Sequence, residues 1–175
     1  MAIRPIVKWG DPVLHTPSLP VPEVTDEIRT LLDDMHETMI AAPGVGLAAP
    51  QIGVGLRVII VDLSVGDDPG QLIELVNPEF ISREGEVKEE EGCLSVPGYA
   101  GSPTRPRFVR VKGLARDGSE RVHEGDGLLA RAFCHEIDHV DGKLFVDRLS
   151  PLKRDLMVRK LRKRAKANDW DEKGS

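Results

Sequence analysis

The sequence predicts one α+β domain, and three observations lead to this prediction. The chain has 175 residues, 40% of them hydrophobic, which matches a single domain with an ordinary core. Strand-like segments are gathered before one strongly apolar helical segment. Neither an internal repeat nor a low-complexity linker divides the chain.

The first helix is expected after a proline-rich arm. Residues 11–24 contain four prolines, which fix φ and remove backbone donors, so this stretch is predicted to be extended and not helical. Thr25 is a suitable N-cap, and apolar residues then recur at helical spacing. The helix is expected to end near Ala42, because Pro43 and a glycine follow.

Two strands, a hairpin and two helices are expected next. Residues 56–63 and 71–80 are apolar and β-branched, which is typical of strands. Alternating residues from 108 to 124, interrupted by an Asp-Gly turn signal, predict a hairpin. Residues 127–140 are apolar at helical spacing, and an amphipathic helix begins near Pro151.

Charge is unevenly distributed along the chain. The net charge is −5, but residues 151–167 hold eight Lys or Arg against the single acid Asp155, which leaves −12 for the rest. Such a segment could touch RNA or another acidic surface. A helix with a solvated outer face would have the same composition, and this simpler interpretation is favoured.

The sequence favours an unsecreted protein without a membrane partner. No apolar run follows the basic residues at the N-terminus, and no window approaches the roughly 18 to 20 apolar residues of a membrane span. We therefore expect a cytoplasmic location. Cys93 and Cys134 are expected to be free thiols or metal ligands rather than a disulfide.

HEIDH at 135–139 is an H-E-x-x-H pattern on a predicted helix. At about 100° per residue, positions four apart share a face, so His135 and His139 can reach one metal ion. Glu136 then lies close enough to handle a proton. An exposed helix with two incidental histidines is the less favoured alternative.

A catalytic metal needs a third ligand, and few residues can supply it. No histidine follows His139, and the only later glutamate is Glu172 in the polar tail, so an upstream ligand or a downstream aspartate is expected. Cys93, in the turn-like EGCLS, is favoured, because a Cys/His/His set leaves a position open for water. The alternative is a small buried Cys93. Cys134 precedes His135 on the helix and is interpreted as packing.

The glycine-rich segment 44–49 fits G-x-G-x-x-A, one form of the dinucleotide fingerprint. It follows a predicted helix instead of a strand, and Pro50 interrupts it, so no nucleotide cofactor is expected. A backbone beside which an extended peptide can run, with Gln51 offering its amide, is one interpretation. A packed loop without a ligand is equally compatible.

Together, GVGLAAPQ (44–51), EGCLS (91–95) and HEIDH (135–139) resemble the three signature segments of the peptide deformylase family. The resemblance extends over most of the chain. It implies a compact α+β domain with antiparallel or mixed sheets packed around a central H-E-x-x-H helix. Residues 1–150 would form the catalytic part, and residues 151–175 a basic helix and polar tail of the same domain.

The resemblance also implies an activity and residue roles. The enzyme would be a metal-dependent hydrolase that removes the formyl group from formyl-methionyl nascent peptides. One divalent ion would be held by Cys93, His135 and His139, and Glu136 would be the acid/base. The Gln51 side chain and the Leu94 N–H would stabilise the oxyanion. The expected substrate contacts are Val45, Gly46, Gly92, Leu128 and Ala132.

Cofactor and partners follow from the same resemblance. The family natively uses iron(II) and accepts nickel, cobalt or zinc. A ribosome contact is expected, if anywhere, through the basic segment that begins at Lys153 and ends at Lys166. Two departures from the family pattern are Cys134, where glutamine is common, and GYAGSPTRP after EGCLSVP, which leaves open whether Arg105 contacts a substrate carbonyl.

Two rival functions remain at this point. An H-E-x-x-H endopeptidase would hydrolyse internal peptide bonds and requires a third ligand after His139, where the sequence offers poor ones. A metal-binding or interaction module without catalysis would not depend on Glu136.

Overall fold

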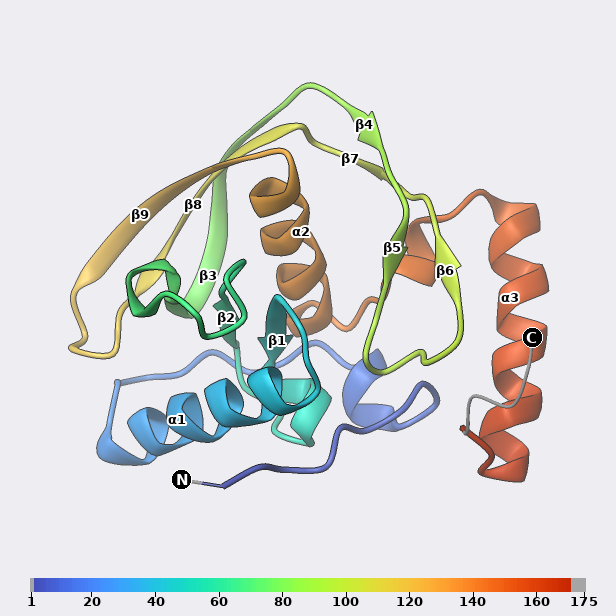
Figure 1. Ribbon diagram of the computed structural model, residues 1–175, viewed down its shortest axis with the longest axis horizontal. Helices are drawn as coiled ribbons and strands as arrows, with labels where there is room; N and C mark the ends of the chain where they lie inside the picture. The colour runs from blue at the N-terminus through green and yellow to red at the C-terminus, as the bar shows by residue number, and fades with distance from the viewer. Residues whose placement is uncertain (1, 171–175) are drawn as a thin grey trace.

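Helix α2 (Leu128–Val140) lies at the centre of the molecule, with strands on one side and loops of two small sheets on the other (Figure 1). The computed structural model describes residues 2–170. The predicted α+β architecture is confirmed: sheets pack around the helix that carries HEIDH.

The main sheet is antiparallel throughout and has the strand order β1-β2-β3-β8-β9. Its strands are β1 (Gly46–Ala48), β2 (Val58–Val61), β3 (Ile73–Glu84), β8 (Phe108–Leu114) and β9 (Glu120–Asp126). Two short pairs accompany it: β4 (Val87–Lys88) with β7 (Thr104–Arg105), and β5 (Glu91–Gly92) with β6 (Ala100–Gly101). One end of the main sheet is therefore β1, a three-residue edge strand that reaches the centre of the fold.

Helix α1 (Asp26–Ala41) forms where the sequence predicts it. The Thr25 side chain accepts a hydrogen bond from the Ile28 N–H at 3.4 Å and caps the helix. The apolar face, which includes Met35 and Met39, is buried against β1 and β2 in one of the three core clusters.

Helix α2 is buried on most of its surface because its apolar side packs against the main sheet. Phe133 and Ile137 join β2, β3 and β8 in a second core cluster. The predicted Asp-Gly stop is confirmed, and the glycine is required: Gly142 has φ 79°, and a Cβ there would lie 2.8 Å from the carbonyl carbon of Thr16.

The structure differs from the sequence prediction in the proline-rich arm and in the glycine-rich segment, and it also contains the unpredicted short strands β4 to β7. Residues 11–24 are not wholly extended, because Pro12–His15 form one 3-10 turn, capped by the Asp11 side chain, which accepts from the Val13 N–H. The glycine-rich segment contains strand β1 and a 3-10 turn, Ala49–Ile52, neither of which was predicted from the sequence.

Helix α3 (Pro151–Ala167) lies at the opposite end of the molecule from β9 and contributes one buried residue, Leu161 (Figure 1). The predicted polar tail, residues 171–175, lies outside the described residues. Within residues 2–170, none of the helices has both the length and the apolar composition needed to cross a membrane. Cys93 and Cys134 are both free, as expected.

Candidate active site

Two consecutive turns of α2 bring the histidine side chains together. Nε2 of His135 and Nε2 of His139 are 3.2 Å apart, and the ring planes are inclined at 73°. Four residues cover slightly more than one helical turn, so both rings project from one face. The predicted pairing of the two imidazoles is therefore present in the structure.

Cys93 completes the set from the loop that follows β5. Its Sγ lies 3.4 Å from Nε2 of His139, and the candidate ligand atoms of Cys93, His135 and His139 all lie within 4.8 Å of one another. The loop is fixed by backbone hydrogen bonds, from Val96 N to Cys93 O and from Trp9 N to Ser95 O. Within residues 2–170 this is the one such cluster of His, Cys, Asp or Glu, and its third member lies upstream of the helix.

Gln51 lies against this cluster and is almost completely buried. Its Oε1 accepts from the Ala48 N–H at 3.0 Å, which turns Nε2 toward Ser95 Oγ at 3.3 Å and Cys93 Sγ at 3.7 Å. The side-chain amide donors of Gln51 therefore face the Cys93 sulfur. The backbone N–H of Leu94 forms no hydrogen bond within the part of the chain that the structure describes.

Glu136 is buried beside strand β1. A Cβ on Gly46 would lie 3.0 Å from Cγ of Glu136, so a larger residue at position 46 would have to displace the Glu136 side chain by a few tenths of an ångström. Oε2 has no hydrogen-bond partner within residues 2–170. Burial raises the pKa of Glu136 to about 7, although the charge of His135 acts in the opposite direction. Such a carboxyl can both accept and release a proton near neutral pH.

A cavity of about 610 Å³ opens over these groups. It brings together nearly all the residues singled out from the sequence. The cavity lining includes Val45, Gly46, Gln51, Gly92, Cys93, Leu94, Leu128, Ala132, His135 and Glu136. His139 is the exception, since it lies fully buried beneath the cavity within the ligand cluster. Val45 and Leu128 line the cavity and are also partly exposed to solvent.

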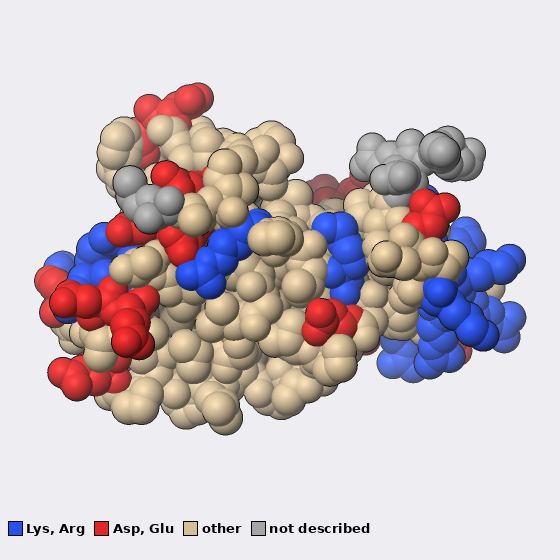
Figure 2. All heavy atoms as spheres, turned by 90° about the horizontal axis from the view of Figure 1, so that it is seen from below, with Lys and Arg blue, Asp and Glu red and all other residues tan. Residues whose placement is uncertain are grey.

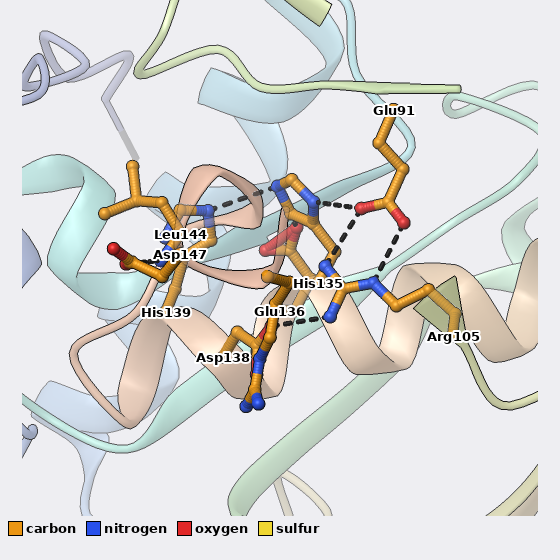
Figure 3. A network of polar contacts seen from close by, with 9 residues as sticks. Glu91, Arg105, His135, Glu136, Asp138, His139, Leu144 and Asp147 are labelled. Atoms are coloured by element: carbon orange, nitrogen blue, oxygen red, sulfur yellow. Dashed lines mark hydrogen bonds and ion pairs between the residues drawn. The ribbon is translucent and has the colours of Figure 1, made fainter. Parts of the chain in front are cut away.

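A buried network of charges supports His135 from the side opposite the cluster (Figure 3). Glu91 lies 3.1 Å from Nδ1 of His135, and Arg105 donates two hydrogen bonds to Glu91, at 2.9 and 3.0 Å. Arg105 also donates to Asp138 at 2.6 Å, and Arg148 donates to Asp138 at 2.9 Å. Burial alone would raise the pKa of Glu91, but the hydrogen bonds from His135 and Arg105 lower it to about 2.

This network answers the question that the sequence left open about Arg105. Its guanidinium is 4% exposed and is committed to Glu91 and Asp138, so it does not line the cavity. Cys134 packs in the core as expected, and burial raises the pKa of its thiol to about 12. Two functional residues were not predicted from the sequence: Glu91 as a partner of His135, and Arg131 as a residue of the cavity lining. The spacing of Arg131 from His135, four residues, was the available signal for the second.

The fold and the cluster define a class: single-domain metal-dependent hydrolases in which an H-E-x-x-H helix and an upstream cysteine could together hold a metal ion. Comparison with known proteins specifies the family. The family model for polypeptide deformylase matches residues 3–155. The peptide deformylase of Acidobacterium capsulatum is 51% identical over 170 residues, which cover 97% of this chain and 100% of that protein.

Solved structures agree with this result. A peptide deformylase from Legionella pneumophila has a TM-score of 0.87 and 46% identity, with 97% of this chain and 99% of that chain covered. Peptide deformylase from Ehrlichia chaffeensis in complex with actinonin has a TM-score of 0.84 and 38% identity, with 94% and 98% covered. The chain belongs to the polypeptide deformylase family. It is a metal-dependent hydrolase that removes the N-terminal formyl group from formyl-methionyl polypeptides.

Proposed function

We propose that Cys93, His135 and His139 hold one divalent metal ion and that Glu136 moves the protons of deformylation. The convergence of the three ligand atoms beside the unpartnered Oε2 of Glu136 carries this proposal. The rival endopeptidase requires a ligand downstream of His139, whereas the cluster is completed from upstream.

The residues fit a metal ion by their chemistry and spacing. Ligand bonds of about 2.0 to 2.3 Å in a tetrahedral site separate ligand atoms by about 3.3 to 3.7 Å, close to the 3.2 and 3.4 Å found here. When bound, a divalent ion would acidify a water molecule toward neutral pKa and polarise the formyl carbonyl. A thiolate with two imidazoles suits iron(II), which we propose as the native ion, and also nickel, cobalt or zinc.

The protein groups would then divide the reaction between them. Glu136 would accept a proton from the attacking water and return it to the nitrogen of the departing amine. The Gln51 amide and the Leu94 N–H would meet the negative charge that develops on the formyl oxygen, each contributing about 3 kcal/mol. Formate and a free methionine amine are the products.

The substrate would lie along the edge strand β1. Gly46 lines the cavity at this edge and would present its backbone to the peptide, an arrangement used in strand addition. Leu128, Ala132 and Val45 would contact the methionine side chain, and Gly92 would contact the peptide from the opposite loop. The confined space around Glu136 would exclude an acetyl group by steric conflict.

The decisive experiment is anaerobic purification with metal analysis, followed by formate release from a formyl-methionyl peptide with and without a chelator. We expect about one iron per chain and chelator-sensitive formate release. The acetylated peptide should give almost no product. Bound metal without formate release would refute the catalytic assignment. Equal cleavage of the formylated and acetylated peptides would refute the steric exclusion of the acetyl group.

We also propose that α3 contacts the ribosome and that the protein works in the cytoplasm. Figure 2 shows Lys and Arg gathered at the end of the molecule where α3 lies. Exposed cations of this kind bind phosphate backbones in a salt-dependent manner. Co-sedimentation with ribosomes should weaken on raising the salt and in the double variant Lys160→Glu, Lys163→Glu, but not in Lys88→Glu on β4. Equal co-sedimentation of the wild type, the double variant and Lys88→Glu would contradict the ribosome contact. Cell fractionation tests the proposed cytoplasmic location.

A further inference from the structure

Two residues that line the catalytic cavity carry a buried polar atom without a hydrogen-bond partner in residues 2–170. One is Oε2 of Glu136, whose freedom the proposed proton transfer uses. The other is Nε of Arg131, for which no step of the reaction has a use. Buried donors without a partner are rare in folded proteins, so we expect this N–H to donate to an acceptor on a molecule bound in the cavity.

The position of Arg131 on α2 indicates where that acceptor would lie. Arg131 comes one turn before the ligand His135 and nearly one turn after Leu128, and both of these residues also line the cavity. One helical turn is about 5.4 Å, which is close to the length of a methionine side chain. The backbone positions of Arg131 and His135 are therefore about one methionine side-chain length apart along α2, and both residues line the same cavity.

Arg131 also differs from the other arginines near the site. Arg105 and Arg148 are committed to carboxylates, whereas Arg131 forms no ion pair within the described part of the chain. Among its guanidinium nitrogens, Nε alone is both buried and without a partner. A carboxylate ligand typically accepts from two guanidinium N–H groups at once. Because only the Nε–H of Arg131 is buried without a partner, a ligand with one acceptor atom fits it better.

We propose that the Nε–H of Arg131 donates a hydrogen bond to the thioether sulfur of the substrate's N-terminal methionine and so determines specificity. Thioether sulfur is a weak acceptor, and it competes best where water is excluded. The inference rests on the proposed methionine pocket, whose other walls, Leu128 and Ala132, recognise only apolar surface. Arg131 would distinguish methionine from an apolar side chain of the same shape.

The test compares formyl-methionyl and formyl-norleucyl peptides of otherwise identical sequence, because norleucine replaces the sulfur by a methylene group. The wild-type kcat/KM should favour methionine by about threefold to tenfold, the range of one modest hydrogen bond. In Arg131→Met and Arg131→Lys the ratio should fall to about 1, since neither side chain has an N–H at the position of Nε. Arg110→Met, on the outer part of β8, should keep the wild-type ratio.

A wild-type ratio near 1 would overturn the inference, and this measurement needs no variant to fold. A ratio that persists in Arg131→Met, or that Arg131→Lys retains in full, would overturn it as well. Leu128→Ala separates the inference from the pocket on which it rests: it should lower kcat/KM for both peptides and leave their ratio unchanged. No effect of Leu128→Ala on either peptide would refute the pocket assignment instead.

Discussion

Nδ1 of His135 donates a hydrogen bond to the carboxylate of Glu91 across 3.1 Å, and this contact leaves Nε2 of the same ring directed at Cys93 and His139. The direction of donation follows from the charge of Glu91. Because the pKa of Glu91 is lowered to about 2, its carboxylate is ionised at neutral pH and can only accept. Nδ1 therefore keeps its proton, and Nε2 is the nitrogen that would give up its proton and bind a metal ion.

Replacing Glu91 by Gln should weaken metal retention. The variant loses the charge that favours the Nδ1–H tautomer, and partners of this kind typically contribute 10-fold to 100-fold in metal affinity. Chelator competition on anaerobically prepared protein measures the change, and Glu89→Gln, an exposed neighbour, is the control. Equal metal affinity in the two variants would mean that Glu91 does not orient His135.

Replacing Glu136 by Gln should strongly reduce turnover without removing the metal. The amide cannot accept a proton from water, and general acid–base catalysis is worth about 100-fold to 10,000-fold. Metal analysis and kcat for formate release are measured on the same sample. A variant that retains wild-type kcat would show that another group moves the proton. A variant that loses its metal would show that the substitution disturbs the folded site and not only the proton transfer.

Gly46→Ala should reduce kcat through Glu136. The new Cβ would meet Glu136 at 3.0 to 3.1 Å and push its side chain by a few tenths of an ångström. Because a misplacement of about 1 Å at a reacting group can lower the rate by about 100-fold, we expect a loss of up to about tenfold. Gly55→Ala is the matched control, because its Cβ would meet only Val13 at an ordinary 3.9 Å. Similar kcat values for the two variants would contradict the claim that the close approach of β1 positions the carboxylate.

Much of the fold could be predicted because its signals are local. The Thr25 cap, the Asp-Gly turn between β8 and β9 and the apolar spacing of α2 each depend on residues within one element. Strand β1 was missed because its three residues lie in a glycine-rich segment and its strand character comes from pairing with β2. The strand propensities of these three residues do not predict that pairing.

Some residues of the site could likewise be predicted from local sequence, whereas others depend on contacts between distant segments. His135, Glu136 and His139 could be predicted from helical spacing, and Cys93 from elimination together with the family resemblance. The hydrogen bond between Glu91 and His135 joins residues 44 positions apart, and Arg105 reaches Asp138 across 33. No single sequence specifies such pairs, because the strands and loops of the whole domain bring them together.

Arg105→Met should destabilise the protein by about 3–5 kcal/mol. Its removal leaves the carboxylates of Glu91 and Asp138, 8% and 7% exposed, without their shared cation. Arg107→Met is the control, since the ion pair of Arg107 with Asp126 is about two-thirds exposed, and its loss should cost about 1 kcal/mol or less. Urea unfolding of both variants tests this, and similar losses would contradict a special role for the buried network.

Asp62→Asn should destabilise the protein in a pH-dependent way. Asp62 is fully buried and accepts hydrogen bonds from Ser64 and Gly66. Burial alone would raise the pKa of Asp62, but these bonds and the charge of His36 lower it below its ordinary value. The folded state therefore gains stability from the ionised form above the unfolded pKa of about 3.9, and loses it as the pH falls through the lowered folded value.

At pH 7 the variant should be less stable by about 1–3 kcal/mol, and the difference from wild type should shrink below about pH 4. Urea unfolding at several pH values measures this, with the exposed Asp67→Asn as the control; a difference that stays constant down to pH 2 would show that the charge of Asp62 is not the source of the stability.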